Sequence, residues 1–305
     1  IEGTRTSLPD LYAYEAGQLP LFELPEDVRE VKNHVRALEY GLQRLETLPL
    51  SLRLLREIHG VLMEGVRGEH LTPGEFRRSQ NWIGPPGCTL SDSVFVPPPV
   101  AEMTGALAEL ETFLHGESDL PTLVRLGLIH YQFEAIHPFL DGNGRMGRLL
   151  VVLLLCTWGL LPAPLLYLSE YLEARRPLYY DLLLAVSQRG AWTEWLEFFL
   201  QGLAVQAGDA IVRAGRLMDL RESYRKRLQT GGASVGLLRL VDVLFSSPIL
   251  SISHIAGELR IAFPTAMRYV GSLERLGILH EVTGRKRDRL YRADEILAAI
   301  TDPSP

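Results

Sequence analysis

The sequence predicts a mainly α-helical protein, in which a helical bundle is followed by a smaller domain of helices and a β-hairpin. Apolar residues recur at three- and four-residue spacing in most segments between residues 28 and 227, which is the pattern of amphipathic helices. A continuous apolar run, Leu149 to Cys156, indicates a buried helix within the bundle. The small, polar segment 230–234 (TGGAS) predicts a flexible boundary between the two parts.

Composition limits the class of protein. The chain has 305 residues, of which 47% are hydrophobic and 22% are charged, an ordinary balance for a globular protein. The formal net charge of −6 argues against wholesale binding to nucleic acid or to an anionic membrane, although a local basic patch is compatible with it. The longest apolar stretch, Leu149 to Leu161, is shorter than the roughly 20 residues that a membrane span requires, so no membrane partner is expected.

The cysteines and the chain start suggest a compartment. Cys88 and Cys156 match neither a metal-ligand pattern nor a disulfide framework. We therefore expect a reducing, cytoplasmic environment. No signal peptide is visible and no Met begins the sequence, so we expect the natural start to lie upstream.

Two helices are predicted before the first break in the pattern, from Val28 to Leu45 and from Leu52 to Met63. The segment 76–99 is the least helical part of the chain, and its prolines bound a short β-prone run, Val94 to Val96. This pattern predicts a hairpin or flap, although a connecting loop fits it equally well. Three side chains there are of the exposed type that can touch a nucleotide or a target: Arg77, Asn81 and Trp82.

Further amphipathic helices are predicted from Val100 to His115 and from Leu120 to Ile136. His130 lies within the second of these helices, where we expect it to be a core or capping residue. The sequence Pro162-Ala163-Pro164 ends the buried helix, because proline cannot continue it. Three more helical segments are predicted to close the bundle: residues 165–187, 192–204 and 211–227.

The segment from His137 to Arg148 (HPFLDGNGRMGR) carries most of the candidate chemistry. Its Gly-rich turn leads into a helix start, where main-chain N–H groups and the helix dipole favour an anion. The segment Gly142-Asn143-Gly144 lets the main chain approach a phosphate closely. Arg145 and Arg148 are three residues apart, so they share one helix face and can grip neighbouring phosphates.

Two further side chains of this segment suit phosphate chemistry. Asp141 offers hard oxygen ligands for Mg²⁺, the usual companion of a nucleoside triphosphate. His137 can accept or give a proton near neutral pH. The structural alternative is a histidine in a tight turn before a core helix, with arginines that merely cap the helix. The combination of all these groups in one short segment favours a nucleotide site.

At these residues the chain resembles the Fic family, whose motif reads HxFx[DE]GNGRxxR. The related Doc toxins alter the GNGR part, so the intact sequence here favours a nucleotidyltransferase over a Doc-like kinase. The resemblance implies a Fic-type helical bundle with a β-hairpin flap, and a protein adenylyltransferase activity that moves AMP from ATP to a hydroxyl side chain of a target protein. Every fixed position of the motif is matched: His137, Phe139, Asp141, Gly142, Asn143, Gly144, Arg145 and Arg148.

The resemblance implies a role for each matched residue. ATP lies with its phosphates over residues 142–144, Asp141 holds Mg²⁺, and Arg145 and Arg148 stabilise the phosphates that depart as pyrophosphate. His137 takes the proton of a Ser, Thr or Tyr hydroxyl on the target, while Phe139 seats the loop in the core. The flap is expected to hold the target as an added strand. Self-modification and a homodimer are further expectations.

Tyr179 and Tyr180 are similar to family positions that line the adenine and ribose pocket. Stacking on a purine is chemically reasonable, but aromatic residues on an amphipathic helix also commonly belong to the core. Two predictions therefore stay open for these tyrosines, contact with the nucleotide and packing in the core.

The first residues, IEGT, match half of an inhibitory pattern found in many Fic proteins, [ST]xxxE[GN], with Glu2 as its carboxylate. The Ser or Thr of that pattern would precede residue 1. By this resemblance, Glu2 would pair with the Arg148 guanidinium meant for the γ-phosphate, so that ATP binds only in an unproductive pose.

Beyond residue 234 the pattern changes to short helices at 237–245, 253–259 and 264–276. Two β-prone runs, 278–282 and 290–291, then bracket the basic sequence TGRKRDR. Three helices followed by a basic β-hairpin resemble a winged helix-turn-helix domain, which implies DNA contact through the third helix and the wing. Protein contact or dimerisation through this domain is the alternative. Basic residues of the wing that can meet phosphates are Arg285, Lys286, Arg287, Arg289 and Arg292.

The predicted organisation has three parts. Residues 1–99 form an N-terminal helical region with the inhibitory segment and the flap, residues 100–229 form the catalytic core, and residues 235–300 form the winged helix-turn-helix domain. Two alternatives to adenylyl transfer stay open: a nucleotide-sensing, DNA-binding regulator, and a Fic-type transferase of another phosphate-containing group.

Overall fold

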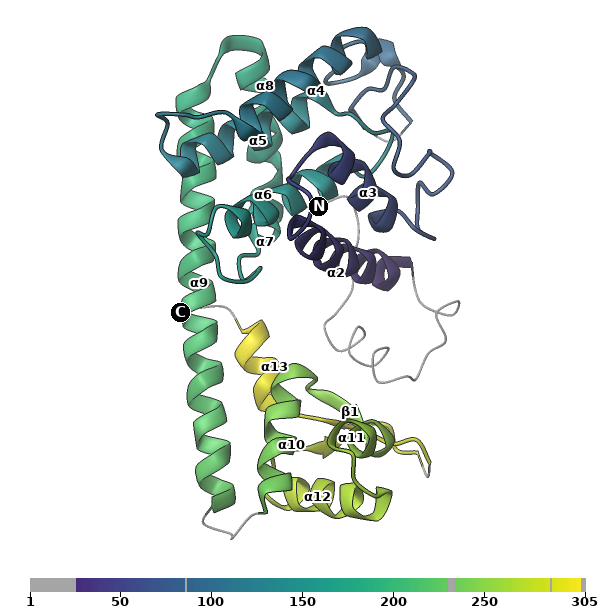
Figure 1. The fold of residues 1–305 in the computed structure, drawn as a ribbon, viewed down its shortest axis with the longest axis vertical. Helices are drawn as coiled ribbons and strands as arrows, with labels where there is room; N and C mark the ends of the chain where they lie inside the picture. The colour runs from purple at the N-terminus through teal and green to yellow at the C-terminus, as the bar shows by residue number, and fades with distance from the viewer. Residues whose placement is uncertain (1–25, 86, 230–233, 286, 303–305) are drawn as a thin grey trace. The chain divides into compact units, whose positions relative to one another are not determined.

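A computed structural model describes residues 26–85, 87–229, 234–285 and 287–302 (Figure 1). The described residues are mainly helical, as predicted. The chain divides into two compact units, with a boundary between residues 207 and 208. This boundary falls inside α9 (Trp192–Gln229), one continuous helix where the sequence predicted two segments. A single glycine between the two segments, Gly208, is too weak a helix breaker to separate them.

In the first unit, α6 (Asn143–Thr157) is the central helix and is buried along most of its length. Its apolar side chains point in every direction, as expected for a helix that is packed on all sides. It contacts α5 (Thr122–Ile136) and α3 (Leu52–Leu62), while α5 also contacts α4 (Val100–His115) and α8 (Arg176–Arg189) (Figure 1). Because α5 and α6 are neighbours, the short loop between them is held at both ends by rigid elements.

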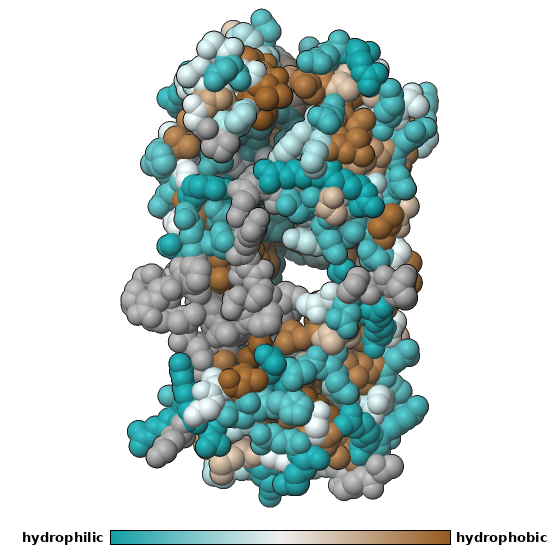
Figure 2. Space-filling model, turned by 180° about the vertical axis from the view of Figure 1, so that it is seen from behind, coloured by the Kyte–Doolittle hydropathy of each residue, from teal (hydrophilic) through white to brown (hydrophobic). Residues whose placement is uncertain are grey.

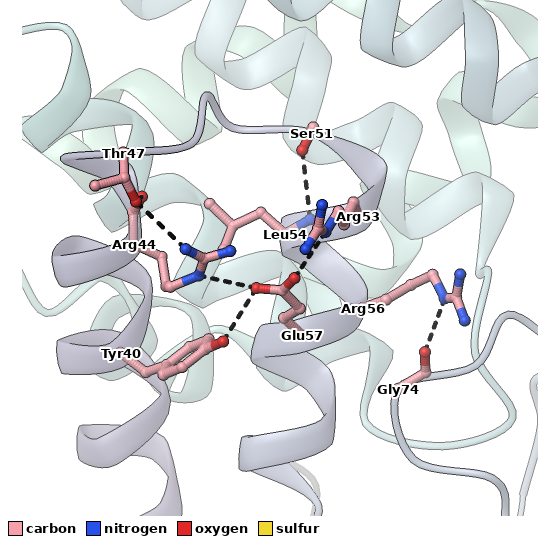
Figure 3. Close-up of polar contacts among 9 residues, drawn as sticks. All are labelled: Tyr40, Arg44, Thr47, Ser51, Arg53, Leu54, Arg56, Glu57 and Gly74. Atoms are coloured by element: carbon pink, nitrogen blue, oxygen red, sulfur yellow. Dashed lines mark hydrogen bonds and ion pairs between the residues drawn. The ribbon is translucent and has the colours of Figure 1, made fainter.

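The helices α2 (Glu26–Leu45) and α3 are joined by a polar network around Glu57 (Figure 3). The Glu57 carboxylate accepts hydrogen bonds from the Tyr40 hydroxyl at 3.0 Å, from Arg44 Nε at 3.0 Å and from Arg53 Nε at 2.9 Å. The hydrogen bond from Arg44, together with those from Arg53 and Tyr40, lowers the pKa of Glu57 to about 2. The network therefore requires an ionised Glu57.

One contact caps the start of α3, and another ties the helix to the loop that follows it. Ser51 caps its start, since the hydroxyl accepts the N–H of Leu54 at 3.4 Å (Figure 3). Arg56 reaches the loop after the helix and donates from Nε to the carbonyl oxygen of Gly74 at 2.9 Å (Figure 3). The loop is therefore tied to α3 at a point close to the next segment, 76–99.

The segment 76–99 folds back on itself in the way expected of a flap, but without regular strands. Its two arms meet in an isolated antiparallel bridge between Ile83 and Phe95, and a short 3₁₀ helix, η2 (Leu90–Asp92), lies between them. The predicted strand Val94 to Val96 does not form. The prolines 97–99 that follow carry no N–H to donate, so a longer ladder cannot be built there.

The predicted helix 165–187 is two helices, α7 (Leu168–Ala174) and α8. Pro177 lies in the first turn of α8. Proline is tolerated at that position but blocks the helix from continuing backwards. The break turns the start of α8, with Arg176, toward the cavity described below.

The second unit combines α10 (Val235–Ser246), α11 (Ile252–Leu259) and α12 (Phe263–Arg275) with a three-stranded antiparallel sheet of order β1-β3-β2. Leu250 of β1 pairs with Tyr291 of β3, and Glu281 of β2 pairs with the same Tyr291. The three predicted helices and the hairpin are therefore present in the predicted order. Its other elements are β1 (Ile249–Ser251), β2 (His280–Glu281), β3 (Leu290–Arg292) and α13 (Asp294–Thr301).

The surface of α12 is partly apolar. Phe263 is 49% exposed and Met267 is 52% exposed. Exposed apolar side chains on this helix can pack against a protein partner or against thymine methyl groups in DNA. The winged-helix assignment and the DNA contact stay predictions.

The face of the molecule in Figure 2 is mostly hydrophilic, with hydrophobic side chains in separate patches. Among the described residues, none of the helices combines the length and the apolar composition that crossing a bilayer demands.

Candidate active site

His137 lies at the end of α5 in a left-handed backbone conformation, with φ of 50° and ψ of 60°. Its main-chain N–H donates to the carbonyl oxygen of Phe133 at 3.1 Å. The ring Nδ1 lies 3.2 Å from the carbonyl oxygen of Glu134. Because a carbonyl can only accept, this contact assigns the proton of the neutral ring to Nδ1. Nε2 is then the nitrogen that can take a proton.

The loop after His137 is braced by the side chain of Asn143. Its Oδ1 accepts the N–H of Phe139 at 2.9 Å, and its Nδ2 donates to the carbonyl oxygen of Phe139 at 2.8 Å. The Phe139 ring is fully buried, in agreement with the prediction that it seats the loop in the core. Asn143 was predicted to bind the nucleotide. Because both polar atoms of its buried side chain bond to Phe139 within the loop, its main chain is the better candidate for that role.

The start of α6 has the geometry of an anion site. Gly142 caps the helix with φ of 76°, a left-handed conformation that glycine adopts without strain. The first N–H groups of a helix have no carbonyl partner within that helix, and the helix dipole adds a partial positive charge there. Residues 142–144 line the cavity described below. A phosphate group fits the start of this helix.

Asp141 stands at the edge of this helix start. Its Oδ1 accepts the N–H of Gly142 at 2.6 Å, and its side chain is 32% exposed. Its main-chain oxygen lies 3.0 Å from Nε2 of His59 on α3. Burial is the main cause that lowers the pKa of His59, to about 4. The main chain of Asp141 is therefore held by a neutral imidazole, while its carboxylate is accessible.

Arg145 and Arg148 differ in their surroundings. Arg148 lines the cavity and is 7% exposed, whereas Arg145 is not among the lining residues. The Arg145 guanidinium instead lies 3.6 Å from Glu30 of α2 and 3.7 Å from Asp141. Arg145 therefore faces the carboxylates of Glu30 and Asp141 in this structure, and the shared grip on phosphates stays a prediction.

The remaining predicted residues meet around one cavity of about 680 Å³, a volume that accommodates a small-molecule ligand. One wall comes from α5, its loop and α6, a second from the segment 76–99, and a third from α8. Glu2 lies outside the described residues. The predicted site residues that line the cavity are His137, Asp141, Gly142, Asn143, Gly144, Arg148, Tyr179 and Tyr180.

The two tyrosines of α8 differ in exposure. Tyr179 is buried, and its hydroxyl lies 3.0 Å from Nε2 of His130. Tyr180 is 41% exposed, with its ring centroid 5.3 Å from that of Tyr179. His130 is fully buried, which confirms its predicted core position, and burial lowers its pKa to about 3. Of the two tyrosines, Tyr180 has the ring that a ligand can reach.

Sequence reasoning missed Glu134, a carboxylate that lines the cavity and is only 8% exposed. Its Oε1 would lie 2.3 Å from a Cβ on Gly147, so the absence of a side chain at Gly147 makes room for it. One signal was available in the sequence. Glu134 precedes His137 by three residues, and residues at that spacing share a helix face.

Arg77 was expected to be exposed, and the structure corrects this. It is 1% exposed, and its guanidinium donates only to main-chain carbonyl groups. Asn81 likewise donates from Nδ2 to the carbonyl oxygens of His137 and Phe139, at 3.2 and 2.9 Å. Trp82 is 42% exposed and lines the cavity, as a candidate for ligand contact would.

A histidine at the end of one buried helix and a glycine-rich start of the next, both lining one cavity, define a class of helical-bundle protein with its candidate site at a helix start. Comparison with known proteins identifies the family. Residues 49–155 match the Fic/DOC family. The chain therefore contains a Fic/DOC domain, and the resemblance predicted from the motif is confirmed.

Relatives agree with this assignment. The chain is 32% identical over 120 residues to Protein adenylyltransferase Fic of Drosophila willistoni, an alignment that covers 39% of this chain and 22% of that protein. The equivalent protein of Drosophila virilis gives the same identity and coverage. The chain thus spans less than a quarter of the length of these relatives.

Solved structures support the fold. A Fic family protein from Desulfovibrio desulfuricans G20 superposes with a TM-score of 0.57 at 23% identity, over 96% of this chain and 82% of that one. A Fic domain-containing signalling protein from Bacteroides thetaiotaomicron VPI-5482 gives a TM-score of 0.51 at 21% identity, over 67% of this chain and 81% of that one.

Proposed function

We propose that this protein is an adenylyltransferase that moves AMP from ATP to the hydroxyl of a Ser, Thr or Tyr side chain on a target protein. One observation supports this most directly. His137, with its Nδ1 proton held by the carbonyl of Glu134, lines the same cavity as the glycine-rich start of α6. A base and a phosphate cradle side by side suit attack of a hydroxyl on phosphorus.

The phosphates of ATP are proposed to lie over the start of α6, where residues 142–144 line the cavity. Arg148 adds a guanidinium that is nearly buried, and its charge is therefore screened little by solvent. The accessible ring of Tyr180 is the proposed contact for the adenine, with Tyr179 behind it as a core residue.

Mg²⁺ fits the residues at this site. Mg²⁺ in nucleotide sites is usually bound by one or two carboxylates together with phosphate oxygens and water. Asp141 provides one partly exposed carboxylate beside the helix start, and no group of three or more possible ligands forms among the residues described. When bound there, the ion would neutralise phosphate charge. Arg145, which faces both Asp141 and Glu30, is proposed to orient the carboxylate.

The proposed reaction is a single in-line displacement. The hydroxyl oxygen of the target forms a bond to the α-phosphorus of ATP, and the bond from that phosphorus to the bridging oxygen breaks. Nε2 of His137 takes the hydroxyl proton, and pyrophosphate leaves with its charge facing Arg148. The segment 76–99 is proposed to align the target, since its bridged arms carry Ile83 and Phe95 at the cavity.

Glu2 is proposed to inhibit the reaction by pairing with Arg148, on the strength of the Glu-Gly sequence alone. Replacing Glu2 by Gly, in a chain that retains the residues upstream, should raise self-modification. Equal labelling of wild type and Glu2→Gly would remove the inhibitory role.

The second unit is proposed to contact DNA or a second copy of the chain. A gel-shift assay with genomic DNA, set beside an AMP-transfer assay, separates a DNA-binding regulator from an enzyme. Its wing places Arg285, Arg287 and Arg289 on the surface, which supports phosphate contact.

The central test measures AMP incorporation from labelled ATP into the protein itself and into cell-extract proteins. His137→Ala should abolish transfer and leave ATP binding within about two-fold of wild type, because the imidazole acts on the attacking hydroxyl and not on the phosphates. Mass spectrometry of the modified residue separates added AMP from phosphate or phosphocholine. Transfer by His137→Ala at the wild-type rate would contradict the proposed base.

A further inference from the structure

Arg77 is a buried cation whose hydrogen bonds go to main-chain oxygens. Its Nε donates to the carbonyl of His137 at 3.0 Å, Nη1 donates to Ser79 at 3.3 Å, and Nη2 donates to Pro98 and, at 3.5 Å, to Ile136. The main-chain N–H of Arg77 also donates to the carbonyl of Pro138 at 2.9 Å. Within the part of the chain that the structure describes, no carboxylate lies within 4.0 Å of this guanidinium.

These acceptors come from two places. Ile136, His137 and Pro138 form the end of α5 and the loop that follows, while Ser79 and Pro98 lie at the base of the two arms of the segment 76–99. The carbonyl groups at a helix end lack partners within the helix and carry a partial negative charge. One guanidinium therefore satisfies the end of α5 and joins it to the segment that covers the cavity.

The residue at the centre of these contacts is held in an uncommon conformation. His137 has φ of 50°, which non-glycine residues rarely adopt, and such a conformation persists only where its surroundings fix it. The carbonyl oxygen of His137 accepts from both Arg77 Nε and Asn81 Nδ2, at 3.0 and 3.2 Å. Both donors thus act on the peptide group that sets the backbone angle ψ of His137.

We infer that Arg77, assisted by Asn81, is a positioning residue for His137: it holds the left-handed turn that aims the imidazole into the cavity, and it links that turn to the base of the segment 76–99. This inference rests on the proposed function, in which His137 is the base. Lysine cannot replace Arg77, because an ammonium group does not span acceptors as far apart as those of the planar guanidinium.

The test compares three single variants of the full chain, together with the double variant that combines Arg77→Lys and Asn81→Ala. Arg77→Lys keeps the positive charge but loses the planar set of N–H donors. Asn81→Ala removes the second donor to the carbonyl oxygen of His137, and Arg78→Lys is the matched control. Arg78 is the next residue, its side chain is 88% exposed, and it forms an ion pair with Glu75 at 3.5 Å. Each variant is measured for thermal midpoint, ATP dissociation constant, and kcat and KM of AMP transfer.

The inference predicts that Arg77→Lys and Asn81→Ala lower kcat by about ten-fold or more while the ATP dissociation constant stays within about two-fold, because a small misplacement of a base costs rate and not ground-state binding. The double variant should lower kcat by less than the product of the single effects, since both donors act on one oxygen. Arg78→Lys should match wild type. A kcat within about two-fold of wild type in folded Asn81→Ala and Arg77→Lys overturns the inference.

A spectroscopic measurement separates this inference from the proposed function. Nitrogen-15 spectra of the His137 ring, assigned with His137→Gln, should show a single neutral tautomer with the proton on Nδ1 in wild type and an averaged pattern in Asn81→Ala. An unchanged pattern refutes the positioning role even if transfer falls. If wild type transfers no AMP, the proposed function fails, and the ring spectra still decide the role of Arg77. If Arg77→Lys does not fold, Asn81→Ala decides both measurements.

Discussion

Nε2 of His59 lies 3.0 Å from the main-chain oxygen of Asp141, and Nδ1 of the same ring accepts the N–H of Gly74 at 2.9 Å. One nitrogen faces an acceptor and the other faces a donor, so these contacts require the neutral ring with its proton on Nε2. The ring also stacks on Phe139, with 3.7 Å between ring centroids. His59 therefore connects α3 with two loops, one at Gly74 and one at Asp141.

We expect the neutral His59 ring to make folding stability depend on pH. Burial lowers its pKa from 6.5 to about 4, so between these values the unfolded chain binds a proton that the folded chain does not. Stability contributed by this group is complete above pH 6.5 and is lost as the pH falls toward about 4. The difference between the two pKa values corresponds to about 3 kcal/mol of folding stability.

Urea denaturation from pH 4.5 to 8 checks this expectation. In His59→Gln, whose amide offers an N–H donor group and an accepting oxygen without titrating, the slope of stability against pH should be smaller than in wild type. His130 is present in both proteins, so its contribution cancels in the comparison. His115→Gln, a change on the exposed surface, is the control for the loss of one histidine. Equal slopes in wild type and His59→Gln would show that the ring is not held neutral.

The Glu57 network gives a second dependence on pH, in the acid range. Hydrogen bonds from Arg44, Arg53 and Tyr40 lower the pKa of Glu57 to about 2, from 4.5. The stability that the ionised carboxylate contributes is complete above about pH 4.5 and is lost as the pH falls toward about 2. Glu57→Gln should therefore reduce stability at pH 7 by about 1 kcal/mol or less, as for an accessible ion pair, and reduce it little at pH 2.5.

Acid denaturation of Glu57→Gln beside Glu39→Gln provides the measurement, because Glu39 lies exposed on the same helix as Arg44. A loss of stability in Glu57→Gln that is the same at pH 7 and pH 2.5 would mean that the amide disturbs packing and not the charge network.

The sequence was sufficient to predict the helical bundle and the loop from His137 to Gly142, because the patterns that determine them are local. The apolar spacing of α5 and the glycines of residues 142–144 each determine structure within a few residues, so the end of one helix and the start of the next were predictable. The family match over residues 49–155 agrees with that reading.

The side chains that brace the loop were not predictable in the same way. Glu30 and Arg145 are 115 positions apart in the sequence, and Arg77 and His137 are 60 apart. In each pair, the local sequence around one residue does not predict that it meets the segment that carries the other. Arg77 was expected to be exposed, and both Arg77 and Glu30 are buried only because segments far apart in the sequence meet in the fold. Likewise, the spacing of Arg145 and Arg148 gave no sign that Glu30 draws Arg145 toward α2.

Gly147→Ala should alter the cavity from within α6. An added Cβ would lie 2.3 Å from Oε1 of Glu134 and 3.3 Å from Cδ1 of Phe133, so the buried carboxylate must move. We expect a loss of stability of about 1–3 kcal/mol, typical of overpacking, together with weaker ATP binding because Glu134 lines the cavity.

The control is Gly105→Ala in α4, where an added Cβ meets nothing within 4 Å. Alanine is favoured over glycine in a helix, so this variant should gain up to about 1 kcal/mol. Denaturation and ATP titration of both variants give the comparison. If Gly147→Ala is as stable as wild type and binds ATP equally well, Glu134 has room to retreat and does not depend on the glycine.

Glu30 should be needed to keep Arg145 buried. Arg145 is 5% exposed, Glu30 is 4% exposed, and their side chains lie 3.6 Å apart. Removing Glu30 leaves the buried Arg145 with Asp141 alone, at 3.7 Å, so Glu30→Ala should reduce stability by up to about 3 kcal/mol. Glu64→Ala is the control, since Glu64 pairs with Arg36 at 2.8 Å on the surface and such pairs contribute about 1 kcal/mol or less. Equal losses in the two variants, measured by urea denaturation, would show that Glu30 does not hold Arg145. A larger loss in Glu30→Ala, with weaker Mg²⁺-dependent ATP binding, would connect α2 to the orientation of Asp141.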